Sequence, residues 1–231
     1  MSDKIVVLDF AGTLIKAEVI EEANRFRAKV LQRGLPTKKE HSKPAELYKA
    51  NNEFVEKLTG LTKDMKITYR ENNLEFMNIN GGTYQNQVST NLFQIGMYMA
   101  AKKHSAAMIP EGLVEELQRI KKLGYKLAIV SGVRTDIISG ILQIAKIPLT
   151  FDHIYAQPPI LGVSNHDNIE SLKVHGSIEF VMGDKLGDLE AGKSIGAKTI
   201  FVRWGHASGG EEEFADYSID KPKDLKNIIK Q

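Results

Sequence analysis

The feature that most constrains this sequence is a series of short apolar segments without alternation of hydrophobic and polar residues. Segments of this kind are typical of strands that are buried on both faces, as in parallel sheets. We expect five such strands and a weaker edge strand, at residues 5–10, 126–132, 153–157, 179–184, 198–204 and, for the edge, 216–220.

Helical patterns lie between the later segments. Leu113, Leu117 and Ile120 recur at helical spacing, and Gly124 follows as a stop signal. Strand and helix therefore alternate from about residue 110 to the end of the sequence. This alternation predicts an α/β fold with a doubly wound, Rossmann-like parallel sheet.

The region between the first strand and the rest of the predicted sheet has a different character. A helical stripe begins at Val19 and runs to Val30, and residues 44–60 and 91–103 indicate further helices. We find no strong strand pattern here. The sequence thus predicts a core made of residues 1–16 and 106–231, with a helical insertion at residues 17–105.

Composition excludes several classes of function. The 31 basic and 29 acidic residues give a net charge of +2, so we expect neither a nucleic-acid nor a membrane-surface partner. The absence of cysteine excludes disulfides, thiolate zinc sites and cysteine nucleophiles. The apolar run after Lys4 is too short for a secretory or membrane segment, and we expect a soluble, cytoplasmic protein.

Polar side chains stand at the ends of three predicted strands. Asp9 ends the first, Ser131 and Gly132 end the second, and Asp184 ends the fourth, with Asp188 four residues later. Ligands of doubly wound sheets bind beyond the carboxyl ends of the strands, so we expect these groups to lie close together.

These residue types suit phosphoryl chemistry. Asp184 and Asp188 can hold Mg²⁺, which prefers oxygen ligands and neutralises and orients a phosphate. Asp9 can then attack phosphorus to form an aspartyl-phosphate. The hydroxyl of Ser131 and nearby backbone amides can bind the phosphoryl oxygens as charge develops on them.

The order of these motifs resembles that of the haloacid dehalogenase superfamily. The first strand leads into "DFAGTL", the second reads "LAIVSG", and the acidic pair lies in "VMGDKLGDLEAG", followed by "IGAKTIFVRWG". The family's first motif is usually DxDGT, and the family places an α-helical cap where this sequence has its helical insertion. The first motif alone is a weak signal, but the ordered combination is specific.

The resemblance implies a role for each matching residue. Asp9 corresponds to the nucleophile and a metal ligand, the carbonyl of Ala11 and the carboxylates of Asp184 and Asp188 to metal ligands, and Thr13 to a support of the first loop. Ser131, with Gly132, corresponds to the phosphate-binding group. The family's third motif is a lysine or arginine, for which we consider Lys173, although Asn168 lies nearer the expected position.

Ala11 departs from the family pattern. Most phosphatases of the family have an aspartate here, which protonates the leaving group and then activates water, and losing such a group typically costs about 10²–10⁴ in rate. Four explanations stay open. The first is that the substrates have good leaving groups, which reduce the need for an acid. The second is that the chain acts on a carbon–phosphorus bond, and the third is that it mainly binds a phosphate ligand. The fourth is that the alanine is an introduced substitution.

The carbon–phosphorus alternative follows the phosphonoacetaldehyde hydrolase branch of the family, whose first motif also has alanine and which uses a cap lysine as a Schiff base. The insertion offers Lys38, Lys39, Lys43 and Lys49 for that role. The sequence favours a Mg²⁺-dependent hydrolase of small phosphate esters or anhydrides, acting on a small phosphorylated metabolite. Dehalogenation is disfavoured because it does not need the metal that Asp184 and Asp188 imply. The substrate and the oligomeric state stay open.

Overall fold

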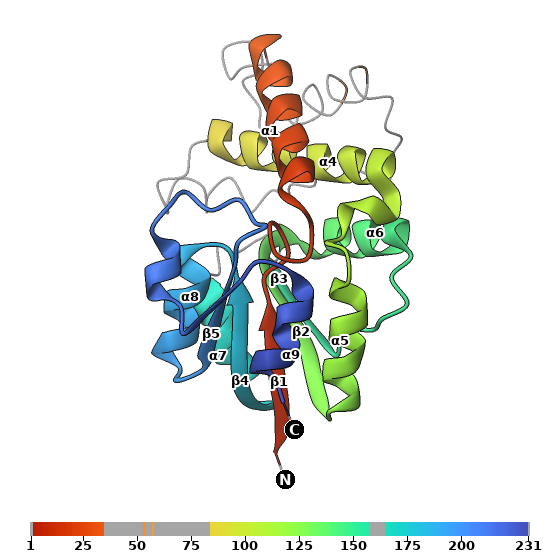
Figure 1. Ribbon diagram of the computed structural model, residues 1–231. Helices are drawn as coiled ribbons and strands as arrows, with labels where there is room; N and C mark the ends of the chain where they lie inside the picture. The colour runs from red at the N-terminus through yellow and green to blue at the C-terminus, as the bar shows by residue number, and fades with distance from the viewer. Residues whose placement is uncertain (1, 35–52, 54–56, 58–83, 158–164, 231) are drawn as a thin grey trace. The chain divides into compact units, whose positions relative to one another are not determined.

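The computed structural model describes residues 2–34, 53, 57, 84–157 and 165–230 of the chain (Figure 1). The chain divides into two compact units. Unit 1 is formed by residues 1–20 and 101–231, and unit 2 by residues 21–100. Each unit is described here by itself.

Unit 1 is built on a six-stranded sheet in which every neighbouring pair is parallel. The strands in chain order are β1 (Asp3–Leu8), β2 (Tyr125–Arg134), β3 (His153–Gln157), β4 (Gly176–Gly183), β5 (Lys198–Val202) and β6 (Tyr217–Ile219). Their order in the sheet is β3-β2-β1-β4-β5-β6, so β1 is central and the chain order reverses beside it. The prediction of a doubly wound parallel sheet is confirmed, including the short strand β6 at its edge.

Helices connect the strands of unit 1. They are η2 (Ser105–Met108), α5 (Leu113–Lys122), α6 (Thr135–Ala145), α7 (Asn165–Leu172), α8 (Leu186–Ser194), η3 (Glu211–Phe214), η4 (Pro222–Asp224) and α9 (Leu225–Ile228). None of the helices in the described part of the chain is both long and apolar enough to cross a membrane.

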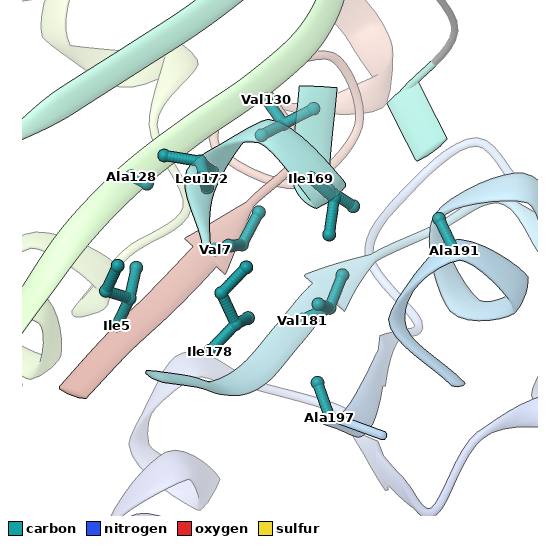
Figure 2. Packing of buried hydrophobic residues seen from close by; sticks show 10 residues of the cluster. All are labelled: Ile5, Val7, Ala128, Val130, Ile169, Leu172, Ile178, Val181, Ala191 and Ala197. Atoms are coloured by element: carbon teal, nitrogen blue, oxygen red, sulfur yellow. The ribbon is translucent and has the colours of Figure 1, made fainter. Parts of the chain in front are cut away.

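The alternation of side chains along the strands divides the core into two layers. On one face, Ile5 and Val7 of β1 and Val181 of β4 pack in a cluster with residues of α7 and α8 (Figure 2). Val6 and Leu8 of β1 are equally buried and, by the two-residue period, belong to the opposite face. Burial on both faces explains why these strands are apolar throughout.

Unit 2 contains most of two long helices, α1 (Ala17–Gln32) and α4 (Tyr84–His104). They come close together at Gly96, because a Cβ atom there would lie 2.9 Å from the Cα of Ala23. The Arg27 guanidinium lies over the ring of Phe93, at 5.7 Å from its centroid. The helix predicted at residues 44–60 falls almost wholly outside the described residues.

Candidate active site

Asp9 is the first residue after the central strand. The register sets Leu8 of β1 beside Ile129 of β2 and Met182 of β4, so Asp9 emerges between the carboxyl ends of two neighbouring strands. Its backbone N–H donates to the carbonyl of Met182 at 2.9 Å, and its side chain is buried. The sheet order therefore brings Asp9 to the point where the direction of chain winding reverses, which is where such sheets bind ligands.

The loop after Asp9 folds back on itself. The N–H groups of Leu14 and Ile15 both donate to the carbonyl of Phe10, and Gly12 N–H donates to the carbonyl of Ile15 at 2.8 Å. Gly12 has a φ of +100°, in the region that favours glycine. This tight turn keeps Ala11 and Thr13 close to Asp9.

Asp184 follows β4 and is fully buried. One oxygen, Oδ2, accepts a hydrogen bond of 2.7 Å from the backbone N–H of His206. A Cβ atom added to Gly12 or to Gly205 would come within 2.3 or 2.2 Å of the Asp184 side chain. The loops after β1 and β5 thus close on this carboxylate, and glycine is needed at both contacts.

Asp188 lies in the first turn of α8 and is also buried. Its Oδ1 accepts a hydrogen bond of 2.9 Å from the side-chain amide of Asn165, at the start of α7. A Cβ atom on Gly183 would lie 2.6 Å from the Cβ of Asp188. Close contact between the end of β4 and the start of α8 therefore sets the position of this carboxylate.

The three carboxylates form one cluster. Asp9, Asp184 and Asp188 each offer an oxygen, and these oxygens all lie within 4.8 Å of one another. Oδ1 of Asp184 and Oδ2 of Asp188 are buried without a hydrogen-bond partner. Buried carboxylate oxygens without partners are costly, whereas hard oxygen ligands at this spacing suit Mg²⁺. The donor set therefore fits a divalent cation.

The burial and closeness of these carboxylates also shift their pKa values. Burial, followed by the charges of Asp188 and Asp184, raises the pKa of Asp9 well above its usual value, against the opposing hydrogen bonds from Phe10 and Ser131. Burial likewise raises the pKa of Asp184, and burial with the nearby Asp184 charge raises the pKa of Asp188 to about 6. A bound cation would favour the ionised forms and offset these shifts.

Ser131 and Thr13 complete the surroundings of Asp9. The Ser131 side chain is buried, hydrogen-bonds to Asp9, and accepts from the N–H of Val133 at 3.3 Å. Gly132 is exposed, and a Cβ atom there would meet no other atom within 4 Å. Thr13 is fully buried, its Oγ1 has no partner, and its carbonyl accepts from the indole N–H of Trp204 at 3.0 Å.

Lys173 does not join this cluster. It comes directly after α7 and three residues before β4 begins, at the amino end of the sheet, where Gly176 pairs with Asp3. Its ammonium is exposed and forms an ion pair of 2.8 Å with Glu170. The eight residues of β4 separate it from Asp184, a span of about 25 Å that no lysine side chain bridges. Asn168 is buried on α7, and its Nδ2 has no partner.

Three groups beside the carboxylates were missed by sequence reasoning. Asn165 was overlooked because its amide is neutral, and the His206 N–H because a backbone group leaves no signal in the residue type. Lys185 lies between the two aspartates in sequence, and its ammonium donates to the carbonyl of His206. Its charge lowers the pKa of Asp184 and Asp188, in opposition to the larger effect of burial. The adjacency of Lys185 to Asp184 was the available signal.

The candidate cap lysines stay predictions. Lys38, Lys39, Lys43 and Lys49 lie outside the described residues. The described residues therefore do not test the Schiff-base alternative.

Comparison with known proteins agrees with the fold. The family model of haloacid dehalogenase-like hydrolases matches residues 6–202, and the chain belongs to this family. Among solved structures, a haloacid dehalogenase-like hydrolase of Streptococcus pneumoniae has a TM-score of 0.62 at 15% identity, with 98% of each chain covered. The β-phosphoglucomutase of Clostridium difficile has a TM-score of 0.58 at 16% identity, with 97% of this chain and 93% of that chain covered. At such identities the likeness shows a shared fold.

Curated relatives with similar sequences are named as phosphatases. The phosphoglycolate phosphatase of Aquifex aeolicus is 28% identical over 49% of this chain and 55% of its own length. The pyrophosphatase PpaX of Bacillus mycoides is 28% identical over 52% of this chain and 59% of its own length. A heptose-bisphosphate 7-phosphatase of Haemophilus influenzae is 31% identical over 52% of this chain and 83% of its own length. The chain thus spans a little over half the length of the first two relatives.

Proposed function

We propose that the protein is a Mg²⁺-dependent hydrolase of small phosphate esters or anhydrides that works through an aspartyl-phosphate. The observation that carries this proposal is the buried cluster of Asp9, Asp184 and Asp188, with two carboxylate oxygens that lack partners. Membership of the haloacid dehalogenase-like hydrolases and the names of the phosphatase relatives support it.

In the first step, a carboxylate oxygen of Asp9 attacks phosphorus. A bond forms between Asp9 and phosphorus while the bond from phosphorus to the leaving oxygen breaks, and that oxygen departs with the electron pair. The hydroxyl of Ser131 and the backbone amide of Gly132 hold the phosphoryl oxygens as charge develops. In the second step, water attacks phosphorus, the bond to Asp9 breaks, and inorganic phosphate and a proton are released.

Asp9, Asp184 and Asp188, with the carbonyl of Ala11, would hold the Mg²⁺. The ion supplies positive charge that favours the ionised nucleophile and draws the phosphate to it. Without that charge, burial and the neighbouring carboxylates favour the protonated, non-nucleophilic form of Asp9 at a higher pH than usual.

Ala11 narrows the substrate class. Its methyl side chain gives no proton to the leaving oxygen, so the best substrates are those whose leaving group is stable as an anion. Aryl phosphates, acyl phosphates and anhydrides such as pyrophosphate meet this condition, and alkyl phosphates do not. We further propose that the helical insertion, residues 17–105, acts as a cap that selects among small phosphorylated metabolites.

A panel of phosphorus compounds tests this function directly. Phosphate release is measured from an aryl phosphate, acetyl phosphate, pyrophosphate, phosphoglycolate and phosphonoacetaldehyde, with Mg²⁺ and with a chelator, and Asp9→Asn serves as the inactive control. We expect Mg²⁺-dependent release from the aryl phosphate and the anhydrides. Release from phosphonoacetaldehyde alone, with a borohydride-trapped lysine adduct, would establish the carbon–phosphorus alternative. Binding of one of these compounds, with no phosphate release from any of them, would establish a binding protein.

A further inference from the structure

The two aspartates after β4 are held in the same manner. Each has one oxygen fixed by a donor outside the cluster: His206 N–H binds Oδ2 of Asp184 at 2.7 Å, and the Asn165 amide binds Oδ1 of Asp188 at 2.9 Å. The other oxygen of each, Oδ1 of Asp184 and Oδ2 of Asp188, is buried without a partner. One oxygen therefore anchors each side chain, and the second is left for a ligand.

The Asp188 carboxylate receives a backbone hydrogen bond from Lys185 and a side-chain one from Asn165. The side-chain donor is held in place by the core. Asn165 begins α7, and Ile169 stands one turn later on the same side of that helix. Ile169 and Leu172 are buried against Val130 and Ala128 of β2 (Figure 2). Packing of α7 on the sheet thus fixes where the Asn165 amide lies, and rigid placement of this kind is what an orienting residue requires.

We infer that Asn165 is a positioning residue for the metal site: its amide fixes the carboxylate of Asp188 so that Oδ2 faces the cation. This inference rests on the proposed Mg²⁺-dependent function. Groups that hydrogen-bond to metal ligands orient them, and their loss typically costs about 10–100-fold in metal affinity.

The choice of an amide has a chemical consequence. An amide N–H holds a carboxylate without adding a positive charge, whereas a lysine or arginine at this position would repel the cation. Asn165 therefore orients Asp188 and leaves the full negative charge of the cluster to the metal.

A purely structural hydrogen bond between α7 and α8 predicts a different pattern. Its loss would lower the melting temperature of the metal-free protein and of the Mg²⁺-loaded protein by the same amount. A positioning role lowers metal affinity, so it reduces the rise in melting temperature that Mg²⁺ produces. It also predicts that turnover lost at low Mg²⁺ recovers at saturating Mg²⁺.

The test compares Asn165→Ser with His166→Ser. Serine is well tolerated at a helix start, its side chain is too short to reach Asp188, and His166 is an exposed neighbour on the same helix. Mn²⁺ binding is titrated by electron paramagnetic resonance and Mg²⁺ binding by calorimetry, and melting is followed with and without Mg²⁺. We expect about a 10-fold higher Kd for Asn165→Ser and no change for His166→Ser. Asn165→Leu, close to asparagine in shape but without a donor, should repeat the result.

Three outcomes would overturn the assignment. The first is a metal Kd within twofold of the wild type for both Asn165 variants. The second is a loss of metal affinity in His166→Ser equal to that in Asn165→Ser. The third is a rise in melting temperature with Mg²⁺ that is the same in Asn165→Ser as in the wild type. A wild-type chain that takes up neither metal would overturn the metal-dependent function itself, and the inference with it. Metal binding without phosphate release would overturn the hydrolase and leave the role of Asn165 standing.

Discussion

Carboxylates at the two ends of the parallel sheet have opposite pKa shifts. At the amino end, Asp152 receives a hydrogen bond of 2.8 Å from Lys121 and one of 2.9 Å from the N–H of Leu127. Partial burial alone would raise the pKa of Asp152, but these donors outweigh burial and lower it. At the carboxyl end, Asp188 is buried beside Asp184 and Asp9, and its pKa is raised to about 6.

From this difference we infer that the charged residues at the amino end contribute to stability, whereas those at the carboxyl end form the candidate site. At the amino end, Asp152 forms an ion pair with Lys121 and Lys173 forms one with Glu170, and such partly exposed pairs need no further ligand. The carboxylates at the other end are buried beside one another, and two of their oxygens have no hydrogen-bond partner. Such an arrangement is costly to a fold unless a cation joins it, so this end of the sheet is where we expect a ligand to bind.

The largest expected effect is at the centre of the cluster. Asp9→Asn should lower turnover by at least about 10⁴-fold, because the amide has the same shape but is not a nucleophile. It also removes one of three neighbouring negative charges, so the metal-free variant should melt no lower than the wild type. Steady-state phosphate release and thermal melting measure both effects. Near-full activity in the variant would remove Asp9 from the mechanism.

The next largest expected effect is a difference in Mg²⁺ affinity between variants at the two ends of the sheet. Asp184→Asn should raise the Mg²⁺ concentration for half-maximal activity by at least about 10-fold, because it removes a hard anionic ligand. The matched variant Asp152→Asn, at the amino end, should leave that concentration unchanged while lowering the melting temperature. Mg²⁺ titrations of activity with both proteins check this contrast. Equal responses would mean that the acidic cluster is not the metal site.

Ala11→Asp tests the missing acid. The new carboxyl would stand two residues past Asp9, where the family places its acid/base group. It should raise alkyl phosphate hydrolysis by about 10-fold or more, because an alkoxide needs a proton far more than an aryl oxide does. Rates on one alkyl and one aryl phosphate are compared in both forms at saturating Mg²⁺. If neither rate rises while the fold and metal binding persist, the binding-protein and cap-lysine alternatives gain support.

The raised pKa values of the cluster predict an unusual pH dependence of stability. A carboxyl whose pKa is raised on folding binds its proton more tightly in the native state, so stability falls as pH rises from its unfolded value near 4. For Asp188 this loss ends at about pH 6. Without metal, the cluster should thus contribute less stability at pH 7 than at pH 4.5.

Mg²⁺ should reverse this trend, because it binds the ionised carboxylates. We expect the rise in melting temperature on adding Mg²⁺ to be several degrees larger at pH 7 than at pH 4.5, since about 1 kcal/mol corresponds to roughly 2–4 °C for chains of this size. Melting curves at both pH values, with and without Mg²⁺, give the comparison. Asp9→Asn should show a weaker pH effect.

The smallest expected effect is at Lys173. Lys173→Ala should leave turnover and Mg²⁺ affinity within about twofold and change stability by less than about 1 kcal/mol, because its ion pair with Glu170 is exposed. Kinetic and melting measurements on this variant complete the comparison of the two ends. A large loss of activity would mean that the amino end takes part in the reaction.

The contrast between Asp9 and Lys173 shows how far the sequence predicts the site. Apolar strands that end in aspartate or serine are readable, because parallel strands place all their carboxyl ends at one edge. Lys173 was considered on its order between motifs, and order along the chain does not say which end of the sheet a residue reaches. The short distance from Lys173 to the start of β4 would have revealed its position.

Asn165 shows a second limit of the sequence. A neutral amide at the start of a short helix has many ordinary roles, and only the contact with Asp188 distinguishes this one. The same holds for Gly12 and Gly205, whose closeness to Asp184 depends on two loops that are far apart in sequence. Local sequence patterns do not predict contacts that arise from the packing of distant segments.

The central position of β1 also governs how the nascent chain can fold. Val7 pairs with Ala128 of β2 on one side and with Val181 of β4 on the other, so β1 leaves the ribosome long before either of the strands that pair with it. Contacts of such long sequence separation form slowly, and an unpaired apolar strand is prone to aggregate in the meantime. Chaperones that shield this segment during synthesis would therefore matter more here than in a protein whose early strands pair with each other.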